Sequence, residues 1–228
     1  MLSGPEAHHL RAVLRLSPGD RVTLLDGTGR LYKTTLTSLT KDEAEVKILK
    51  IREAERTPVV VQFGQALLKG KKMDLLVQKA NELGIEVLEP FISSRCEVKI
   101  GAPEKEERWQ RIILESCKQS GRALPMACRP IRAWEALLAD EAAFDLNLIF
   151  WEGEEQHSLR RVFDTLAASP RSVRAFIGPE GGFSAEEIRQ AEAAGFQAVS
   201  LGRRTLRAET ASLAAMAILQ HHFGNLEC

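Results

Sequence analysis

The decisive stretch of this sequence is Ile177-Gly178-Pro179-Glu180-Gly181-Gly182-Phe183-Ser184. An apolar strand ending at Ile177 breaks at glycine, and Ser184 followed by Glu187 forms a capping box that begins a helix. Glycine has no Cβ, so the backbone here can approach a ligand closely. The spacing matches neither G-x-G-x-x-G nor G-x-x-x-x-G-K-[ST]. The stretch predicts a ligand-holding strand-to-helix loop, or else a tight turn without a ligand.

A second loop of the same kind is Leu201-Gly202-Arg203-Arg204-Thr205-Leu206-Arg207-Ala208-Glu209-Thr210-Ala211. It lies between a predicted strand at 198–201 and a predicted helix at 211–223. Its three arginines suit planar anions and the carbonyl-rich edges of bases. Without a ligand, Glu209 and Thr210 would simply cap the last helix. Two such loops at the carboxyl ends of neighbouring strands predict a cradle for a nucleotide-like cofactor.

Strands and helices alternate in the sequence that leads up to these loops. Apolar strands are predicted at 59–63, 87–92, 146–150 and 173–177. One helix carries its apolar face at Met73, Leu76, Val77, Ala80 and Leu83, and another carries Trp109, Ile112, Ile113, Ser116 and Cys117. Gly84 and Gly121 end these helices. The alternation predicts an α/β domain with a largely parallel sheet.

The N-terminal part has a different pattern, rich in short strands. Strands are predicted at 21–25, 31–39 and 44–51, with a turn at Asp26-Gly27 between the first two. The charged residues 52–56, followed by Thr57-Pro58, read as a linker. We therefore predict a small β-barrel domain over residues 1–56 and the α/β domain over residues 57–228.

Composition and charge narrow the class of protein. The 228 residues are 44% hydrophobic and 27% charged, as in ordinary globular proteins. The four cysteines form no C-x-x-C pair, no apolar run has the length of a membrane span, and no signal peptide opens the chain, which predicts a cytoplasmic protein without a membrane partner. His8-His9 lacks further ligands at workable spacing, so no metal is expected. Residues 1–132 carry 23 Lys and Arg against 17 Asp and Glu, whereas residues 133–228 carry 8 against 14. The positive excess indicates contact with a polyanion, or an uneven solvated surface.

Taken together, these stretches resemble the SPOUT class of S-adenosylmethionine-dependent RNA methyltransferases. More narrowly, the chain resembles the bacterial family that methylates N3 of a uridine in 16S ribosomal RNA. The resemblance covers nearly the whole chain and is carried by HHLRAVLRLSPGD, DGTGRLY, LLKGKKMDLLVQKANELGI, ESCKQSGR, IGPEGGFS and LGRRTLRAETA. The family more often has Thr where this chain has Ala208, a change that we expect to matter little.

The resemblance implies a fold that periodicity does not reveal. It implies an N-terminal PUA-like β-barrel that binds RNA, followed by a SPOUT α/β domain with a deep trefoil knot. In that knot the last helix is threaded through the loops at Gly178 and Leu201. It also implies a homodimer, with 16S ribosomal RNA or the assembled small ribosomal subunit as the partner.

The resemblance also implies the cofactor and its site. S-adenosylmethionine would lie bent between the two loops, held largely by backbone groups of Leu201, Gly202 and Leu206. Gly178, Glu180 and Gly181 would form the other side of the cofactor site. Trp151 follows a strand where a pocket wall is expected, although a buried tryptophan of the core is the stronger alternative.

The methyl-accepting atom, uridine N3, determines what the catalytic residues must do. Uridine N3 must lose a proton, which leaves negative charge on the two flanking carbonyl oxygens. We expect Arg207 to stabilise that charge. Glu209 or Glu180 would accept the proton or orient the arginine, although Glu209 also suits helix capping. Arg95 would face the cofactor or target pocket of the partner subunit.

Basic residues in both predicted domains are candidates for RNA contact. His9, Arg11, Arg15 and Arg30 would form a basic face on the barrel. Lys69, Lys79 and Arg122 are further candidates by the family resemblance. For Lys79 a surface ion pair with Glu82 at i,i+3 is the simpler interpretation.

Two other functions remain open at this stage. The same scaffold could methylate a ribose 2′-hydroxyl or a tRNA base. Alternatively, the chain could be a non-catalytic RNA-binding module with a degenerate cofactor domain, although the glycines of both loops are intact.

Overall fold

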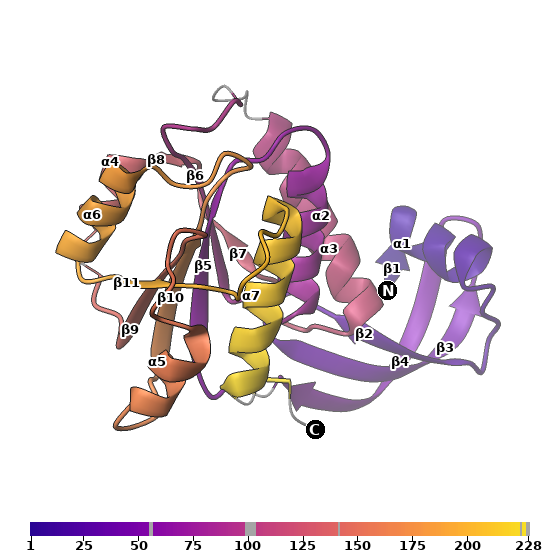
Figure 1. Ribbon diagram of the computed structural model, residues 1–228. Coiled ribbons are helices and arrows are strands. Elements are labelled where there is room, and N and C mark those ends of the chain that lie inside the picture. The colour runs from indigo at the N-terminus through magenta and orange to yellow at the C-terminus, as the bar shows by residue number, and fades with distance from the viewer. Residues whose placement is uncertain (55–56, 99–103, 141, 224, 227–228) are drawn as a thin grey trace. The chain divides into compact units, whose positions relative to one another are not determined.

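The chain divides into two units in the computed structural model, which describes residues 1–54, 57–98, 104–140, 142–223 and 225–226 (Figure 1). The first unit comprises Met1–Glu55 with Gly121–Pro125, and the second comprises Arg56–Ser120 with Met126–Cys228. The predicted boundary between residues 56 and 57, and the end of the predicted linker, lie at residues outside the described part. The boundary therefore stays a prediction.

The first unit is built on an antiparallel sheet with the strand order β1-β4-β3-β2. The strands are β1 (Leu2–Ser3), β2 (Arg21–Leu25), β3 (Arg30–Leu39) and β4 (Glu43–Glu53). Helix α1 (Pro5–His8) and the π-helical turn η1 (His9–Val13) lie between β1 and β2 in the chain. Leu10 and Leu36 are buried in a small core with Ala7 and Ala44. Among the described residues β1 and β2 are not paired with each other, so closure into a barrel stays a prediction.

The second unit contains a parallel sheet with the strand order β11-β9-β10-β5-β6-β7, and β8 also pairs with β6. The strands are β5 (Val60–Ala66), β6 (Val87–Ile92), β7 (Ala127–Cys128), β8 (Arg132–Ala133), β9 (Leu146–Phe150), β10 (Ser172–Ile177) and β11 (Gln197–Val199). The sheet confirms the predicted parallel α/β architecture. Because β10 is central, residues 173–177 are buried on both sides, as expected of a parallel strand.

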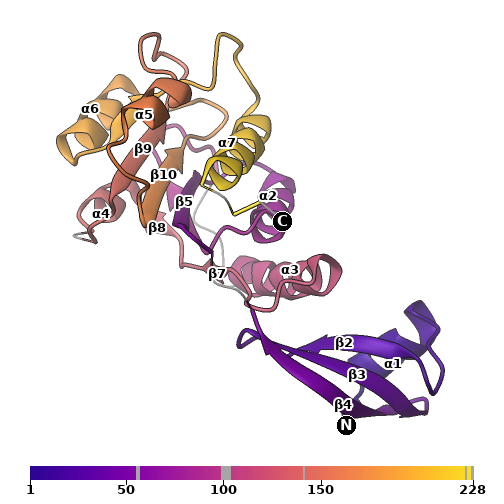
Figure 2. The same ribbon diagram turned by 90° about the horizontal axis from the view of Figure 1, so that it is seen from below.

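Helices cover both faces of this sheet (Figures 1 and 2). The helices are α2 (Lys72–Glu82), α3 (Glu104–Ser120), α4 (Trp134–Leu138), α5 (Leu159–Thr165), α6 (Ala185–Ala193) and α7 (Ala208–His222). In both views α4 and α6 lie on one side of the sheet, and α2, α3 and α7 lie on the other. On the α4 and α6 side, Phe91, Trp134, Phe176, Phe183 and Phe196 form an aromatic core. No described helix combines the length and the apolar character needed to cross a membrane.

The sequence placed the long elements well and missed the short ones. The predicted strands at 87–92 and 146–150 match β6 and β9, whereas α4 and α5 have five and seven residues and show no helical period. Strand β5 was predicted to end at Phe63 but continues through Gly64 and Gln65. A Cβ on Gly64 would lie 2.2 Å from the Phe176 ring, so this glycine makes room for an aromatic ring and does not end the strand.

Candidate functional site

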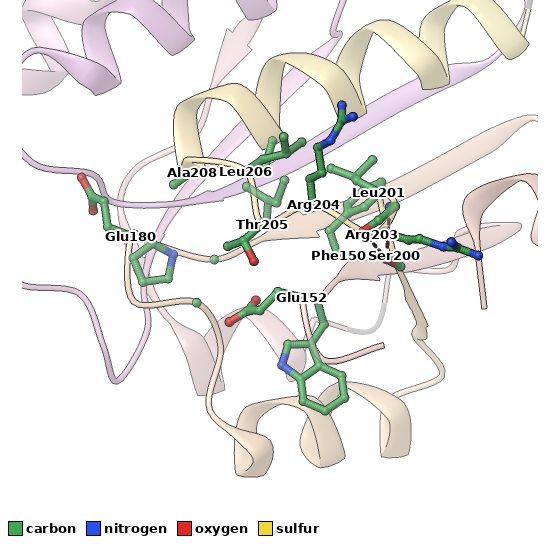
Figure 3. Close-up of a pocket in the computed structure, with 17 residues that line it drawn as sticks. Phe150, Glu152, Glu180, Ser200, Leu201, Arg203, Arg204, Thr205, Leu206 and Ala208 are labelled. Atoms are coloured by element: carbon green, nitrogen blue, oxygen red, sulfur yellow. Dashed lines mark hydrogen bonds between the residues drawn. The ribbon is translucent and has the colours of Figure 1, made fainter. Parts of the chain in front are cut away.

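A cavity lies at the carboxyl ends of β9, β10 and β11, where ligands bind in open parallel sheets (Figure 3). Each strand contributes the residues that follow it in the chain. The cavity is lined by Phe150, Trp151, Glu152, Ile177, Gly178, Pro179, Glu180, Gly182, Ser200, Leu201, Gly202, Arg203, Arg204, Thr205, Leu206, Ala208 and Ala211. The structure thus brings the two loops singled out by the sequence to one place.

The first loop, residues 178–184, is held in shape at both of its ends. The Gly182 amide donates to the Pro179 carbonyl at 2.9 Å, which closes a tight turn. Gly182 has a φ of +65°, a conformation that favours glycine. The ring of Phe183 is buried and stacks on Phe91, with 6.2 Å between ring centroids. The loop is therefore anchored in the aromatic core while its backbone faces the cavity.

The predicted capping box at the end of this loop is present. Ser184 Oγ accepts from the Glu187 amide at 3.2 Å, and Glu187 Oε2 accepts from the Ser184 amide at 2.8 Å. Glu187 Oε1 also accepts from the Ser94 amide at 2.7 Å. The buried Glu187 side chain thereby joins the start of α6 to the segment that follows β6.

Arg95 holds the outer side of the first loop. Its guanidinium donates to the carbonyl oxygens of Gly181 at 2.9 Å and Phe183 at 3.2 Å. A Cβ on Gly181 would lie 3.2 Å from Arg95 Cβ. Gly181 is not part of the cavity lining, whereas its neighbour Gly182 is. The structure thus places both Gly181 and Arg95 behind the cavity wall.

The second loop follows the edge strand β11. The Trp151 amide donates to the Val199 carbonyl at 3.0 Å, and the Ser200 amide donates to the His157 carbonyl at 2.9 Å. Gly202 has a φ of +117°. Leu201, Gly202 and Leu206, the predicted backbone contacts, all line the cavity. The half-buried Trp151 also lines it while packing against the aromatic core, so both interpretations of that residue apply.

A lysine that the sequence did not single out joins the two loops. Lys72 Nζ lies 3.0 Å from Glu180 Oε1 and 3.1 Å from Glu209 Oε2. The Lys69 amide also donates to Glu180 Oε1 at 3.2 Å. Hydrogen bonds to the two carboxylates raise the pKa of Lys72 above its ordinary value. All three side chains are therefore charged at neutral pH.

The same contacts decide the protonation of the two glutamates. Burial opposes ionisation of Glu180, but hydrogen bonds from Lys72 and backbone amides outweigh it and lower its pKa. The pKa of Glu209 is also lowered. The largest cause is a hydrogen bond from its own amide; burial opposes it, and the contact with Lys72 lowers the pKa further. A carboxylate with a lowered pKa is a weaker proton acceptor. This speaks against either residue as a strong general base.

Arg207 lies beside the cavity and is not among the residues that line it. It is the N-cap residue of α7 and its side chain is exposed. Its charge helps to lower the pKa of Glu209. Arg203 and Arg204 do line the cavity, and Figure 3 shows them extending away from Glu152. The three arginines of this loop are thus separated into two that line the cavity and one beside it.

Buried polar groups link the segments around the cavity by hydrogen bonds. Ser212 Oγ donates to Gln65 Oε1 at 2.6 Å, and Gln65 Nε2 donates to the carbonyls of Ala66 at 2.9 Å and Gly178 at 3.5 Å. Both side chains are fully buried. They connect β5, the first loop and α7, three segments that are distant in the sequence.

The residues predicted to contact RNA are distributed over both units. Arg11, Arg15 and Arg30 are exposed and His9 is half-buried in the first unit, and Arg122 belongs to a segment grouped with that unit. In the second unit Lys69 pairs with Glu97 at 2.5 Å and Lys79 pairs with Glu82 at 2.7 Å. The i,i+3 interpretation of Lys79 is therefore confirmed. Within the described ranges, no group of three or more His, Cys, Asp and Glu side chains could hold a metal ion.

Three residues of the site have no signature in the sequence. Lys72, Gln65 and Ser212 carry no local signal, because each acts on a segment far along the chain. Glu152, which follows Trp151 after the strand end at Phe150, was predicted with Trp151 as a possible pocket wall, and it does line the cavity. Gly182 was not separated from Gly181, since only the φ angle and the nearby side chains distinguish them.

Comparisons with known proteins agree with this geometry. Residues 55–220 match the family model described as an RNA methyltransferase domain, and residues 2–49 match the RNA methyltransferase PUA domain. A relative from Buchnera aphidicola, named ribosomal RNA small subunit methyltransferase E, is 31% identical over 99% of this chain and 91% of its own length. A relative of the same name from Aquifex aeolicus is 33% identical over 85% of this chain and 82% of its own length.

Two solved structures have the same fold over almost the whole chain. Ribosomal RNA small subunit methyltransferase E from Neisseria gonorrhoeae, bound to S-adenosyl methionine, has a TM-score of 0.85 at 34% identity and covers 96% of this chain and 91% of its own. A methyltransferase from Legionella pneumophila, in complex with the same cofactor, has a TM-score of 0.84 at 34% identity, covering 96% and 90%.

Proposed function

The chain belongs to the family of ribosomal RNA small subunit methyltransferase E, and from this premise we propose that it methylates N3 of a uridine in 16S ribosomal RNA with S-adenosylmethionine as the methyl donor. One observation carries the proposal: the two loops at Gly178 and Leu201 meet in one cavity at the carboxyl ends of β9, β10 and β11. The family membership supports the methyltransferase activity and the ribosomal RNA substrate. The choice of N3 rests on the sequence resemblance.

The residues of the cavity fit the proposed cofactor. Ile177, Leu201 and Leu206 offer apolar walls for an adenine ring, and Gly178 and Gly202 also line the cavity. The carboxylates of Glu152 and Glu180 suit the hydroxyl and ammonium groups of such a molecule. When bound, S-adenosylmethionine supplies a methyl group that its sulfonium has already activated.

We assign to Arg207 the stabilisation of the methyl acceptor, the deprotonated uridine. Loss of the N3 proton puts negative charge on two uridine oxygens, and a guanidinium placed near them stabilises that charge. Arg207 suits this role, because its exposed side chain has no hydrogen-bond or ion-pair partner among the described residues. Glu209 lies two residues further and interacts electrostatically with it. We assign to Glu209 the electrostatic orientation of Arg207, and not proton removal, because the Lys72 ammonium, 3.1 Å from its carboxylate, helps to lower its pKa.

Arg95 takes a supporting role in this proposal. Its guanidinium is occupied by the carbonyl oxygens of Gly181 and Phe183, so it fixes the shape of the first loop. The same holds for Gly181, whose missing side chain lets Arg95 pack closely. Of the two glycines for which the sequence suggested a close approach to the cofactor, only Gly182 lines the cavity, and its missing side chain leaves room for the Glu152 carboxylate.

RNA contact is proposed for the exposed arginines of the first unit. Arg11, Arg15 and Arg30 can neutralise phosphates without losing an internal partner, and the match to a PUA domain supports this role. Lys69 and Lys79 are weaker candidates, since each already forms an ion pair. A ribosomal RNA substrate also supports the predicted cytoplasmic location.

The knot and the homodimer are further parts of the proposal. Strand β11 lies at the sheet edge beside β9, yet α7 packs on β5 and β10. The chain between them must therefore cross the ends of β9 and β10, which is the path that a threaded tail would take. Sedimentation equilibrium tests the dimer directly: a mass of one chain over the whole accessible concentration range would contradict it.

The experiment for the proposed function identifies the modified nucleoside. The purified protein is incubated with methyl-labelled S-adenosylmethionine and small ribosomal subunits or 16S ribosomal RNA from a strain that lacks this modification. Digestion and mass spectrometry should then reveal 3-methyluridine. A 2′-O-methylated nucleoside, or methylation of tRNA only, would refute the N3 assignment. No product, together with no heat of S-adenosylmethionine binding in calorimetry, would favour a non-catalytic RNA-binding module.

A further inference from the structure

Lys72 stands out because its position is unfavourable for the helix that contains it. It is the first residue of α2, where the helix dipole favours negative charge and disfavours a cation. Two carboxylates offset this at 3.0 and 3.1 Å, one from Glu180 and one from Glu209. Its placement therefore has to be explained by these contacts and not by the stability of α2.

The two partners of Lys72 belong to two segments that follow different strands of the sheet. Glu180 lies in the first loop and lines the cavity itself. Glu209 is in the first turn of α7, directly after the lining residue Ala208. One ammonium group thus connects two segments that touch the ligand site from different strands. The contact from the Lys69 amide to Glu180 adds a second attachment to the same carboxylate.

Isolated ion pairs at the surface contribute little to stability. A cation shared by two carboxylates contributes more, because three charges interact in one small network. Glu180 and Glu209 have side chains that are 28% and 18% exposed, so solvent screens them incompletely. Without Lys72 the two neighbouring negative charges would repel each other. Lys72 therefore attracts both carboxylates and at the same time offsets the repulsion between them.

We propose that Lys72 is a positioning residue, a clasp that holds the first loop and the start of α7 at the separation that the ligand requires. The identity of the ligand, S-adenosylmethionine, rests on the proposed function, whereas the clasp itself is a property of the protein without ligand. The proposal assigns no step of methyl transfer to Lys72.

The test compares Lys72→Met, Lys72→Arg and Arg189→Met in the full-length protein. Arg189→Met is the matched control, because it removes a cation that pairs with Glu186 on α6, away from the cavity lining. Titration calorimetry with S-adenosylmethionine at pH 7.5 should show about tenfold weaker binding for Lys72→Met. Lys72→Arg and Arg189→Met should stay within about twofold of the unchanged protein.

The pH profile separates positioning from a general loss of stability. In Lys72→Met the unpaired carboxylates have raised pKa values, so protonation of one of them at lower pH removes the repulsion. Binding by Lys72→Met should therefore recover several-fold between pH 7.5 and pH 5, while the unchanged protein shows no such recovery. A pH-independent loss, or an equal loss in Lys72→Arg, would overturn the clasp.

A second measurement needs no ligand at all. Amide hydrogen exchange of residues 178–184 and 207–212 should become faster in Lys72→Met and stay unchanged in Arg189→Met. Unchanged exchange in Lys72→Met would overturn the proposal even if S-adenosylmethionine did not bind. Faster exchange in a protein that fails to bind S-adenosylmethionine would support the clasp and refute the proposed cofactor, so the two failures can be told apart.

Discussion

Gly178 shows how a single missing side chain shapes the cavity. A Cβ at this position would lie 3.1 Å from the carbonyl carbon of Gly182 and 3.2 Å from the Phe183 nitrogen. These are backbone atoms, so they cannot move aside as a flexible side chain could. The close return of the loop therefore favours glycine at residue 178, and a larger residue would require the backbone of Gly182 and Phe183 to shift.

We expect Gly178→Ala to weaken S-adenosylmethionine binding about tenfold or more, since overpacking of this kind costs about 1–3 kcal/mol and displaces the loop. Titration calorimetry measures the affinity. Gly195→Ala is the control: Gly195 has a φ of +85°, so alanine is strained there, but no atom lies within 4 Å of the new Cβ. The control should lose some stability and keep its affinity. Equal affinity in both variants would show that the first loop does not hold the cofactor.

Arg207 has a different role at the same scale, because it stands outside the cavity lining. We expect Arg207→Ala to lower kcat about a hundredfold while the Kd for S-adenosylmethionine changes less than about twofold. The charge that Arg207 stabilises is present mainly near the transition state. Single-turnover methylation and calorimetry measure the two quantities, with the exposed Arg160→Ala as control. A parallel loss of affinity and turnover would mean that Arg207 only shapes the second loop.

At the scale of elements, the residues that cap the start of α6 also contact the segment after β6. Ser184 and Glu187 satisfy each other's backbone amides, as the sequence predicted. The sequence did not reveal that Glu187 also accepts from the Ser94 amide at 2.7 Å. The cap therefore fixes the first loop to the segment after β6, which also carries Arg95.

This difference gives a measurable ranking of two substitutions. Ser184→Ala should lower the free energy of unfolding by about 1 kcal/mol, the usual cost of an N-cap. Glu187→Ala should cost about 2–3 kcal/mol, because it leaves the Ser94 and Ser184 amides without their partner. Urea denaturation measures both, with the exposed Glu192→Ala as control. Equal costs for the two variants would show that the Ser94 contact contributes nothing.

At the scale of the whole molecule, charge is divided between the two parts of the sequence. The excess of Lys and Arg over residues 1–132 includes the exposed arginines of the first unit. Such residues bind phosphates by releasing counterions, so affinity depends on salt. The second unit carries the cavity and its acidic side chains. The change of charge at residue 132 does not coincide with the division into units, because the first unit carries 10 Lys and Arg against 8 Asp and Glu. Its exposed arginines, and not its net charge, therefore support RNA binding by that unit.

We expect RNA affinity to fall steeply with salt, and the substitution of both Arg11 and Arg15 by Gln to make the slope of log K against log salt shallower by about 1–2. Fluorescence anisotropy with a 16S ribosomal RNA fragment measures the slope. Arg171→Gln removes an exposed cation of the second unit and should leave the slope unchanged. An unchanged slope in the double variant would exclude these two arginines as phosphate contacts.

The sequence by itself determined the features that depend on neighbours along the chain. The strands ending at Ile177 and Phe150, the cap at Ser184 and the helix ends at Gly84 and Gly121 follow from periodicity and backbone conformation. These signals act over a few residues, so they survive in any fold that the chain adopts.

Only the tertiary structure decided which distant groups meet. It joined Lys72 to Glu180 and Glu209, set Arg95 against the carbonyl of Gly181, and made Gly64 a seat for the Phe176 ring. These contacts depend on the order of strands in the sheet and on the path of the chain between them. An ion pair between residues more than a hundred positions apart leaves no local pattern, because its energy arises only when the two chain segments are brought together.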